Sequence, residues 1–479
     1  MSRTKVTNTA KTIASRITSI LAPLIFVSAF LIYALIHHQR HQQFLTYGWD
    51  LAVFDQPIYL FSQGKTPFSS LHNTHTLGDH WHPLLLLAGG ALYKLWADPR
   101  MLLWLESAIA VASAIVIYVL AKKVLRQPVL ALALAVMYLF SVGFQAMVLD
   151  DFHDDVLVTL PLTLLFLFLH QKRWLGYWIS VVWVLLTKEE FGLLVAAIGL
   201  FLILRYRYFK QGLTTMAMGI ISFFLLLNII MPKFAAGTYW QYGYRHYSDT
   251  NRPSAVLSRF LEKPQLLITT LIDHPAKRQT FLVSFVSFAG LPVLAPVYLL
   301  PAFESLMIRF VDPTAPLRFA FNNHYNGPLI TLLAVASIYG ARRTLKFIPP
   351  FFLTGIILVI TLVQNLLFHG PVNSIFKTAF YQTQAWQEDA RELIRQVPRS
   401  GSLATQNFLL PHLSQRESYA LLPEIKDADY VAVVLNYSGP DFYGPPLDKL
   451  KAQLDDLIAA NQYKIIWRRN QALLLTKVR

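Results

Sequence analysis

The chain has 479 residues, of which 54% are hydrophobic and 14% are charged, and it contains no cysteine. Soluble domains carry roughly 25% charged residues, so this chain has too few polar groups to cover a water-soluble surface, and the lack of cysteine excludes disulfides and thiolate metal sites. The net charge of +15 could indicate nucleic-acid binding, but we exclude that partner because much of the basic charge lies in short clusters between apolar blocks.

The first predicted element is a membrane span over residues 17–36. Basic residues precede it, and the uncharged run Ile17–Ile36 is long enough to cross a bilayer, which takes about 20 apolar residues. A cleaved signal peptide would need a small-residue cleavage site, but His37, His38 and Gln39 follow the run. We therefore expect a retained first span with a cytoplasmic N-terminus.

Further apolar blocks predict spans over 101–121, 128–149, 156–171, 174–187, 190–204, 213–231, 326–341 and 349–368. Pro292, Pro296 and Pro301 interrupt the region 281–310, and proline breaks helix hydrogen bonding. One kinked span and a short hairpin both fit this region. The basic residues after 341 favour the hairpin, because they should be cytoplasmic and the chain must then return outside before 326. The total is about ten or eleven transmembrane helices.

Basic and acidic residues alternate along the connections between these blocks. Basic residues follow every second block and include Lys122, Lys123, Arg126, Lys172, Arg173, Arg205, Arg207 and Lys210. The positive-inside rule places these connections in the cytoplasm and the acidic ones outside. We therefore predict a multi-pass protein of the cell membrane whose outer loops include 38–100 and 232–280.

The composition changes near residue 372. The last part, 372–479, has 13 Lys and Arg against 11 Asp and Glu, so nearly all of the net charge lies before it. Three features indicate a small α/β domain: helical spacing over 386–397 and 447–458, a buried strand over 429–435, and a terminal hairpin. We expect an all-α membrane domain over 1–371 followed by an extracytoplasmic α/β domain over 372–479.

The first polar cluster follows the first span and contains Asp50 and Asp55. Ionisable groups at membrane depth are expensive and are therefore functional candidates by default. Five positions separate the two carboxylates, so they need not share a helix face. They could act as a base or a metal ligand, or they could cap a helix N-terminus at the interface.

The second cluster is Gly78–Pro83, and further histidines precede it. Aspartate and histidine together suit metal binding or proton transfer, which makes His80 a catalytic candidate. Shared ligation by His80 and His82 would need an extended backbone, because they are two positions apart. A polar loop is the alternative, but the density of histidine favours a functional site.

The third cluster places four carboxylates and one histidine within Asp150–Asp155. Like charges this close repel one another unless a cation offsets them. A solvated acidic loop and a divalent-cation site both fit this pattern. Mg²⁺ or Mn²⁺ would suit the carboxylates, because these are hard oxygen ligands.

The fourth cluster is Lys188–Glu190, in a tight turn between two short spans. A Lys–Glu ion pair would lower the cost of keeping these charges near the membrane, although a plain polar turn fits almost as well. Arg245, Arg318 and His324 are later candidates, because a lipid phosphate at the outer surface would need basic partners. A solvated loop also accounts for each of them singly.

Several of these stretches together resemble one membrane-protein family. They are Asp50–Gln56, Gly78–Pro83, Lys188–Glu189, Leu291–Pro296 with Pro301, His324–Tyr325 and Pro411–Arg416. The chain is similar over most of its length to the bacterial and archaeal membrane proteins grouped as domain of unknown function 2079. That family resembles the GT-C glycosyltransferases, which are multi-spanning enzymes that take sugars from polyprenyl-phosphate carriers on the outer membrane face.

The resemblance implies a role for each candidate. GT-C enzymes place an acidic residue just after the first span as general base or metal ligand, which points to Asp50, with Asp55 as the other choice. Metal-dependent members use an acidic motif in the second outer loop, where this chain departs from the usual carboxylate pattern by including histidine. The implied Mg²⁺ or Mn²⁺ ligands are Asp151, His153, Asp154 and Asp155. The implied groups for substrate and phosphate are Lys188, Glu189, Arg245, His324 and Arg318.

Three functions are compatible with these features. The first is transfer of a sugar from a polyprenyl-phosphate carrier to an acceptor on the outer membrane face. The second is transport or flipping of a lipid or polysaccharide precursor, but transporters usually place ionisable groups near the bilayer midplane, and these spans are nearly free of charge. The third is a non-catalytic role in membrane assembly.

Overall fold

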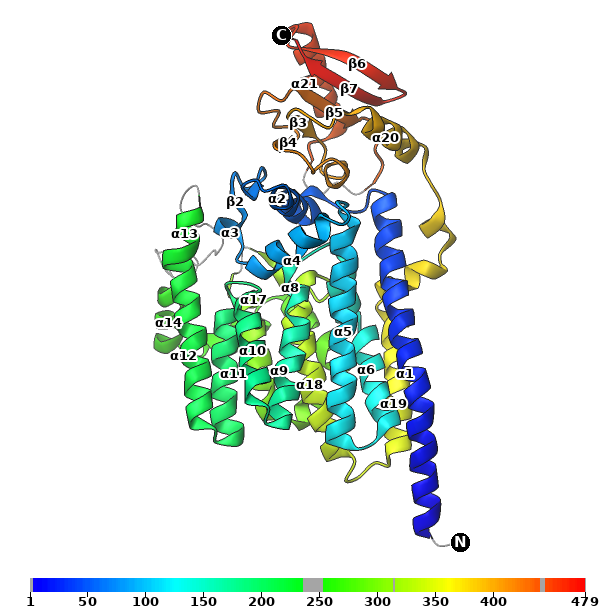
Figure 1. Cartoon of the computed structure of the whole chain (residues 1–479), viewed down its shortest axis with the longest axis vertical. Helices are drawn as coiled ribbons and strands as arrows, with labels where there is room; N and C mark the ends of the chain where they lie inside the picture. Colours follow the sequence, from blue (N-terminus) through cyan, green and yellow to red (C-terminus); the bar gives the residue numbers. More distant parts are fainter. Residues whose placement is uncertain (1–2, 236–252, 313–314, 440–443, 479) are drawn as a thin grey trace.

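A long helical bundle carries a small β-sheet domain at one end (Figure 1). This computed structural model describes residues 3–235, 253–312, 315–439 and 444–478, with the backbone alone for 3–14 and 253–257. We call the end of the bundle next to the sheet the domain end. The opposite end, where the N-terminus and the turn after residue 125 lie, is the basic end.

The bundle is formed by helices from most of the chain. They are α1 (Arg3–Gln42), α5 (Arg100–Leu125), α6 (Pro128–Phe140), α7 (Val142–Leu149), α8 (Asp154–Leu157), α9 (Thr159–Gln171), α10 (Trp174–Leu185), α11 (Phe191–Tyr206), α12 (Phe209–Leu225), α16 (Pro275–Ser287), α17 (Leu300–Phe310), α18 (Gly327–Thr344) and α19 (Pro350–Leu367). Short helices lie toward the domain end or beside the bundle: α2 (Val53–Ser62), α3 (Thr76–Asp79), α4 (Pro83–Tyr93), α13 (Met231–Phe234), α14 (Pro253–Glu262) and α15 (Leu266–Ile272).

Three helices end in the same way at the basic end. α5, α9 and α11 are followed by Arg126, Lys172 and Arg207, each with a positive φ of 55–57° that closes the last turn. A left-handed residue commonly ends a helix, and a basic side chain there is stabilised by the negative end of the helix dipole. The basic connections seen in the sequence are therefore also helix C-termini.

Among the described residues, five helices are long and apolar enough to cross a membrane: Ser15–Gln42, Arg100–Leu125, Asp154–Gln171, Phe209–Phe234 and Pro350–Leu367. The pair α6 and α7, bent by 49°, would make a sixth span. α10 and α11 are apolar but have 12 and 16 residues, which is roughly 18–24 Å against a hydrocarbon core of about 30 Å. The sequence predicted ten or eleven spans by counting such shorter helices, whereas the described residues hold five or six that are long and apolar enough.

The region 281–310 forms a hairpin, as the charge pattern predicts. α16 leads to two short 3₁₀ turns, Leu291–Leu294 and Pro296–Leu299, and α17 returns. Lys277 Nζ donates to the Phe310 carbonyl oxygen at 2.7 Å, which joins the open ends of the hairpin. The prolines lie at the first positions of helical turns, where the missing N–H costs little.

The C-terminal domain is built around a five-stranded sheet in the order β4-β3-β5-β7-β6. Its strands are β3 (Leu403–Thr405), β4 (Tyr419–Leu421), β5 (Tyr430–Val434), β6 (Tyr463–Arg469) and β7 (Ala472–Lys477). β3 is parallel to β4 and β5, while β7 is antiparallel to β5 and β6. With the helices α20 (Ala385–Gln396) and α21 (Leu447–Ala459), this confirms the α/β class; the boundary at 371/372 stays a prediction.

One hydrophobic cluster joins the bundle to the sheet domain. Phe44, just after α1, packs against Trp386 and Phe408 with ring centroids 5.7 and 6.2 Å apart. All three rings are buried, and the same cluster includes Ala472 and Leu474 of β7. The sheet domain is therefore packed onto the segment that follows the first span.

Gly327, the first residue of α18, lies against α8. A Cβ at this position would overlap the carbonyl oxygen of Asp155. We expect Gly327→Ala to destabilise the protein by about 1–3 kcal/mol, because backbone must move to relieve the overlap. Gly355→Ala in α19 is the control, since nothing lies within 4 Å of its Cβ position. Thermal unfolding in detergent should show a lower Tm for Gly327→Ala alone; equal Tm values would contradict the close packing.

Candidate functional site

Asp50 lies on a single turn of π-helix, Gly48–Ala52, that the C-terminal domain holds in place. The Gly48 N–H donates to Asn407 Oδ1 at 2.8 Å, and Tyr419 Oη donates to the Ala52 carbonyl oxygen at 3.1 Å. A Cβ on Gly48 would come within 2.9 Å of Asn407 Oδ1, so the close approach requires glycine. The position of Asp50 thus depends on contacts from more than 350 residues away in sequence.

Asp50 belongs to one of two Asp–His pairs that lie side by side. Asp50 Oδ1 lies 3.1 Å from His153 Nε2, and Asp150 Oδ2 lies 2.9 Å from His324 Nδ1. The two imidazole rings stack with centroids 3.3 Å apart and planes 7° apart. The Asp50 and Asp150 side chains are 30% and 32% exposed, so solvent or a substrate can reach both carboxylates.

The two histidines of this cluster have opposite pKa shifts. Burial lowers the pKa of His153, but the hydrogen bond and charge of Asp50 outweigh it and raise the pKa to about 9. Burial and the charge of His153 lower the pKa of His324 to about 4. Burial raises the pKa of Asp150, but the His324 hydrogen bond outweighs it and lowers it to about 2. Near pH 7 one ring is therefore charged and the other neutral, which avoids repulsion within the stack.

A second group of charges surrounds Lys188, in the turn between α10 and α11. Lys188 Nζ lies 2.8 Å from Asp155 Oδ2, 3.5 Å from Asp154 Oδ1 and 3.8 Å from Glu190 Oε1. Arg318 Nη2 lies 3.1 Å from Glu190 Oε2. All of these side chains are largely buried, so the ammonium group balances carboxylates that would otherwise be costly to bury.

A third group is centred on Asp79. Its Oδ2 atom lies 2.6 Å from both His72 Nδ1 and His80 Nδ1. Burial lowers the pKa of His80, but the charge and hydrogen bond of Asp79 raise it to about 10, so His80 is a cation near pH 7. His82 Nδ1 lies 3.9 Å from Asp154 Oδ2, which connects this group to the carboxylates around Lys188.

Asp55 is fully buried, away from the two Asp–His pairs. Tyr93 Oη and Ser414 Oγ donate to its carboxylate at 2.5 Å each, and Gln415 Nε2 donates at 3.2 Å. Two of these donors come from the Pro411–Arg416 stretch, so Asp55 ties α2 to the C-terminal domain. The catalytic role suggested for Asp55 remains a prediction, and its burial does not favour it.

The burial of Asp55 predicts a pH effect on stability. Burial raises the pKa of this carboxyl from 3.8 to about 6, despite the hydrogen bonds from Ser414 and Tyr93. Between about pH 4 and pH 6 the folded chain binds more protons at Asp55 than the unfolded chain, so this contribution to stability is lost as pH rises. Asp55→Asn removes this pH-dependent contribution to the free energy of unfolding, which is worth up to about 3 kcal/mol. The Tm of Asp55→Asn minus that of the wild type should therefore be more positive at pH 7 than at pH 4.

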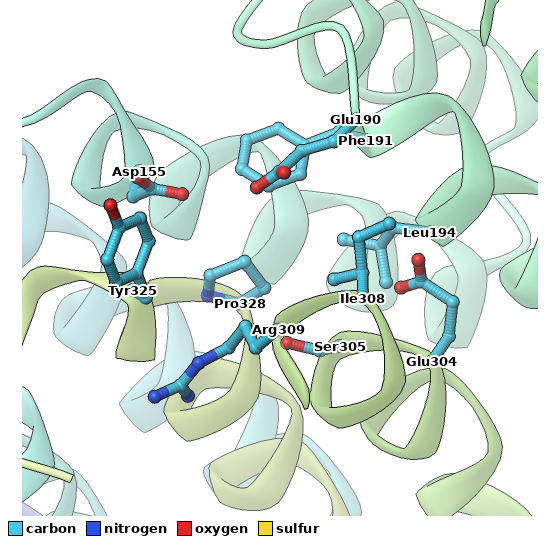
Figure 2. Close-up of a pocket in the computed structure, with 10 residues that line it drawn as sticks. All are labelled: Asp155, Glu190, Phe191, Leu194, Glu304, Ser305, Ile308, Arg309, Tyr325 and Pro328. Carbon is cyan, nitrogen blue, oxygen red and sulfur yellow. The ribbon is translucent and has the colours of Figure 1, made fainter. Parts of the chain in front are cut away.

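Figure 2 shows a narrow cavity next to the Lys188 group, lined by the carboxylates of Asp155, Glu190 and Glu304 and by Arg309. The centre of a water molecule can occupy about 10 Å³ of this cavity, which is room for roughly one water. Arg309 Nη1 donates to Asn326 Oδ1 at 2.9 Å, which holds the guanidinium in place. Glu304 Oε1 is buried without a hydrogen-bond partner among the described residues.

The structure brings together most of the residues that the sequence singled out. Asp50, His153 and His324 form one cluster, while Lys188, Asp154, Asp155 and Arg318 form the neighbouring one. Glu189 accepts a hydrogen bond from the Trp81 N–H at 3.0 Å, beside His80. Arg245 lies outside the described residues.

The carboxylates expected to share a metal with His153 do not gather around it. Asp154 and Asp155 face Lys188, and Asp151 accepts hydrogen bonds from the Tyr47 and Phe152 N–H groups at 2.7 and 2.9 Å. The residues placed to share an ion are instead Asp150, His153 and His324. The ligand set expected from the sequence therefore stays a prediction, and of its four members this group contains His153 alone.

Sequence reasoning missed two residues that support the site. Asn407, which positions the turn carrying Asp50, has no signal in the sequence because its role depends on tertiary contact alone. Glu106 is fully buried in α5 and accepts the His153 N–H at 3.3 Å. An acidic residue within an apolar span is itself a functional signal, so Glu106 could have been found.

The bundle, the sheet domain and the ionisable groups at the domain end are those of a polytopic membrane protein. A sequence profile described as predicted membrane protein (DUF2079) matches residues 40–473, and the chain belongs to this family. This confirms the resemblance inferred from the motifs. The comparison with curated proteins gave no match.

Two solved structures share the fold. ArnT from Cupriavidus metallidurans bound to undecaprenyl phosphate is similar with a TM-score of 0.55 and 12% identity, over 95% of this chain and 98% of that one. ArnT from the same organism in the apo state gives 0.50 and 14%, over 96% and 98%. At such identity the likeness shows the fold alone: the chain has an ArnT-like fold, mostly helical with a small C-terminal sheet region, as expected for a helical membrane domain followed by an α/β domain.

Proposed function

We propose that the protein transfers a sugar from a polyprenyl-phosphate carrier to a hydroxyl acceptor at the domain end of the bundle. The observation that carries the proposal is the position of Asp50. Its carboxylate is partly exposed, lies on a turn held by the C-terminal domain, and contacts His153, whose ring stacks on that of His324. The ArnT structure with bound undecaprenyl phosphate supports the same type of carrier for a chain of this fold.

In this proposal Asp50 is the general base. Its carboxylate accepts the proton of the acceptor hydroxyl while that oxygen attacks C1 of the sugar, and the lipid phosphate leaves with the bonding electrons. His153 contacts Asp50 through Nε2 and orients the carboxylate. A new glycosidic bond forms, the C1–phosphate bond breaks, and the proton passes to Asp50.

The carrier phosphate needs positive charge. Lys188 and Arg318 lie 5.8 and 5.2 Å from the centroid of the Tyr325 ring, so the two cations approach the same aromatic ring next to His324. Both already face carboxylates, and His80 adds a third cation with a side chain that is 26% exposed. We assign the phosphate to this group, with Glu189 holding the loop that carries His80.

We assign the acceptor to a cleft beside the C-terminal domain. A cleft of about 510 Å³ lies between α2 and the sheet domain, lined by Tyr59, Lys65, Arg399 and the segment 415–418 among others. Gln415 lines this cleft and also donates to Asp55 on the helix that follows Asp50. The charged side chains among its lining residues suit a hydrophilic acceptor better than a second lipid.

We place the domain end on the outer face of the cell membrane. The support is the basic end, because its Lys and Arg clusters should remain cytoplasmic under the positive-inside rule. The N-terminus would then be cytoplasmic and the sheet domain extracytoplasmic. Cysteine labelling at an introduced Ser438→Cys should succeed with a membrane-impermeant reagent in intact cells; labelling only after lysis would reverse this topology.

The function is tested with the purified full-length protein, polyprenyl-phosphate sugars and a panel of hydroxyl acceptors. Transfer of labelled sugar by the wild type, together with release of the lipid phosphate, is the expected result. Thermal stabilisation by undecaprenyl phosphate, but not by the free alcohol undecaprenol, would support binding through the phosphate. If no carrier is turned over and none binds, the proposed function is wrong.

One observation favours a transporter as the second candidate. Glu304 Oε1 on α17 is buried without a hydrogen-bond partner among the described residues, and ionisable groups at membrane depth mark substrate or proton paths. Proteoliposomes can separate the two functions. Movement of a lipid-linked sugar between leaflets that Glu304→Gln stops and Asp50→Asn leaves intact would favour transport over transfer.

A further inference from the structure

Three side chains from distant parts of the chain converge at the domain end. Asp150 directly follows α7, His153 directly precedes α8, and His324 lies just before α18. Each offers one donor atom, and the three donor atoms lie within 4.8 Å of one another. Within the described parts of the chain, no other group of three His, Asp or Glu side chains meets this condition.

His153 is arranged as a metal ligand would be. Its Nε2 atom lies 3.1 Å from Asp50 Oδ1, whereas its Nδ1 atom is buried and has no hydrogen-bond partner among the described residues. Metal-binding histidines usually donate one ring N–H to a carboxylate, which fixes the tautomer and leaves the other nitrogen for the ion. A buried nitrogen without a partner costs free energy, and an ion at Nδ1 would remove that cost.

We infer that Asp150, His153 and His324 bind one divalent transition-metal ion, with Asp50 orienting His153 from the outer shell. Metal–ligand bonds of about 2.0–2.2 Å put the donor atoms around one ion roughly 3–4 Å apart, so a small movement inward is sufficient. The imidazole rings stack face to face, and coordination by both would tilt them out of this stack.

The donor set selects the class of ion. Two imidazoles and one carboxylate suit Zn²⁺, Fe²⁺ or Mn²⁺, because imidazole favours transition metals. Mg²⁺ prefers an octahedral shell of oxygens at about 2.1 Å and is a poor match for two nitrogens. This narrows the expectation from the sequence, in which carboxylates alone pointed to Mg²⁺ or Mn²⁺.

One of the three proposed ligands, His153, contacts Asp50, but the proposal that they bind a metal does not depend on the proposal of sugar transfer. Asp50 and Asp150 place two carboxylates beside the stacked rings of His153 and His324. An ion would offset this charge and could face an anionic group of a substrate. Metal binding is measured without turnover. The metal site can therefore prove wrong while the transferase proposal holds, and the transferase proposal can prove wrong while the metal site holds.

The test uses full-length protein in detergent, stripped with a chelator and titrated separately with ZnCl₂, MnCl₂ and MgCl₂. Metal retained after gel filtration is measured by mass spectrometry, and affinity by calorimetry. We expect about one Zn²⁺ or Mn²⁺ per chain and no retained Mg²⁺. His324→Ala and Asp150→Asn should abolish retention, and Asp50→Asn should weaken affinity by about 10- to 100-fold as an outer-shell change.

His369→Ala is the matched control, because His369 is exposed and lies away from these residues in sequence. It should bind metal like the wild type. Thermal unfolding and gel filtration establish that each variant is folded, and His324→Gln replaces His324→Ala if the latter is not. The inference is overturned if the wild type retains no transition metal, if only Mg²⁺ binds, or if His72→Ala abolishes binding while His324→Ala does not.

Discussion

Asp50→Asn is expected to lower kcat for sugar transfer by about 10²- to 10⁴-fold, the range that a positioned general base contributes. The substitution keeps an oxygen that can accept from His153 Nε2, so the turn that carries residue 50 should retain its position. It removes the negative charge that takes the acceptor proton. The KM for the lipid carrier should change little, since the phosphate is assigned to Lys188 and Arg318. Steady-state kinetics with labelled carrier measures both constants.

The control for this experiment is Asp448→Asn. Asp448 is an exposed carboxylate in the first turn of α21, on the sheet domain, and its replacement should leave kcat within about twofold. If Asp50→Asn keeps a similar rate while His80→Ala or Asp150→Asn loses it, the base is another residue of the site. If none of the three changes the rate, the cluster is not where transfer occurs.

The fold was largely predictable from local signals. Apolar blocks gave the bundle helices, and the basic residues after them matched the positions where α5, α9 and α11 end. Charge balance alone favoured the hairpin over 281–310, which α16 and α17 form. Helix length relative to bilayer thickness was less predictable, because hydropathy shows where a helix is apolar but not where packing and turns will end it.

The site was predictable as a set of candidates but not as a geometry. His153 and His324 are 171 positions apart, and no periodicity within one helix can show that their rings stack. Asp50 and Asp55 show a related limit. Asp50 lies on a π-helical turn and contacts His153, whereas Asp55 lies in α2 and accepts from Ser414 and Gln415 of the C-terminal domain. No spacing in the sequence predicts this difference, because it depends on the packing of Ser414 and Gln415 against α2.

Lys188→Met is expected to be among the most destabilising single substitutions in the chain, at about 3–5 kcal/mol. Removing one partner of a buried ion pair leaves the other charge uncompensated. Here the uncompensated groups would be Asp155 at 2.8 Å and Asp154 at 3.5 Å, each with a side chain no more than 3% exposed. Methionine preserves the length of the side chain, so lost packing adds little to the effect. Chemical and thermal unfolding in detergent should both show the loss.

Two further variants separate the ion pair from other causes. Lys188→Met with Asp155→Asn should recover part of the lost stability, because the double variant buries one fewer unpaired charge. Lys65→Met is the matched control: Lys65 pairs with Glu417, but both side chains are more than half exposed, and such surface pairs contribute about 0–1 kcal/mol. Equal losses for Lys188→Met and Lys65→Met would show that water reaches the Lys188 group. In that case the cation would be free to bind a carrier phosphate without first leaving Asp154 and Asp155.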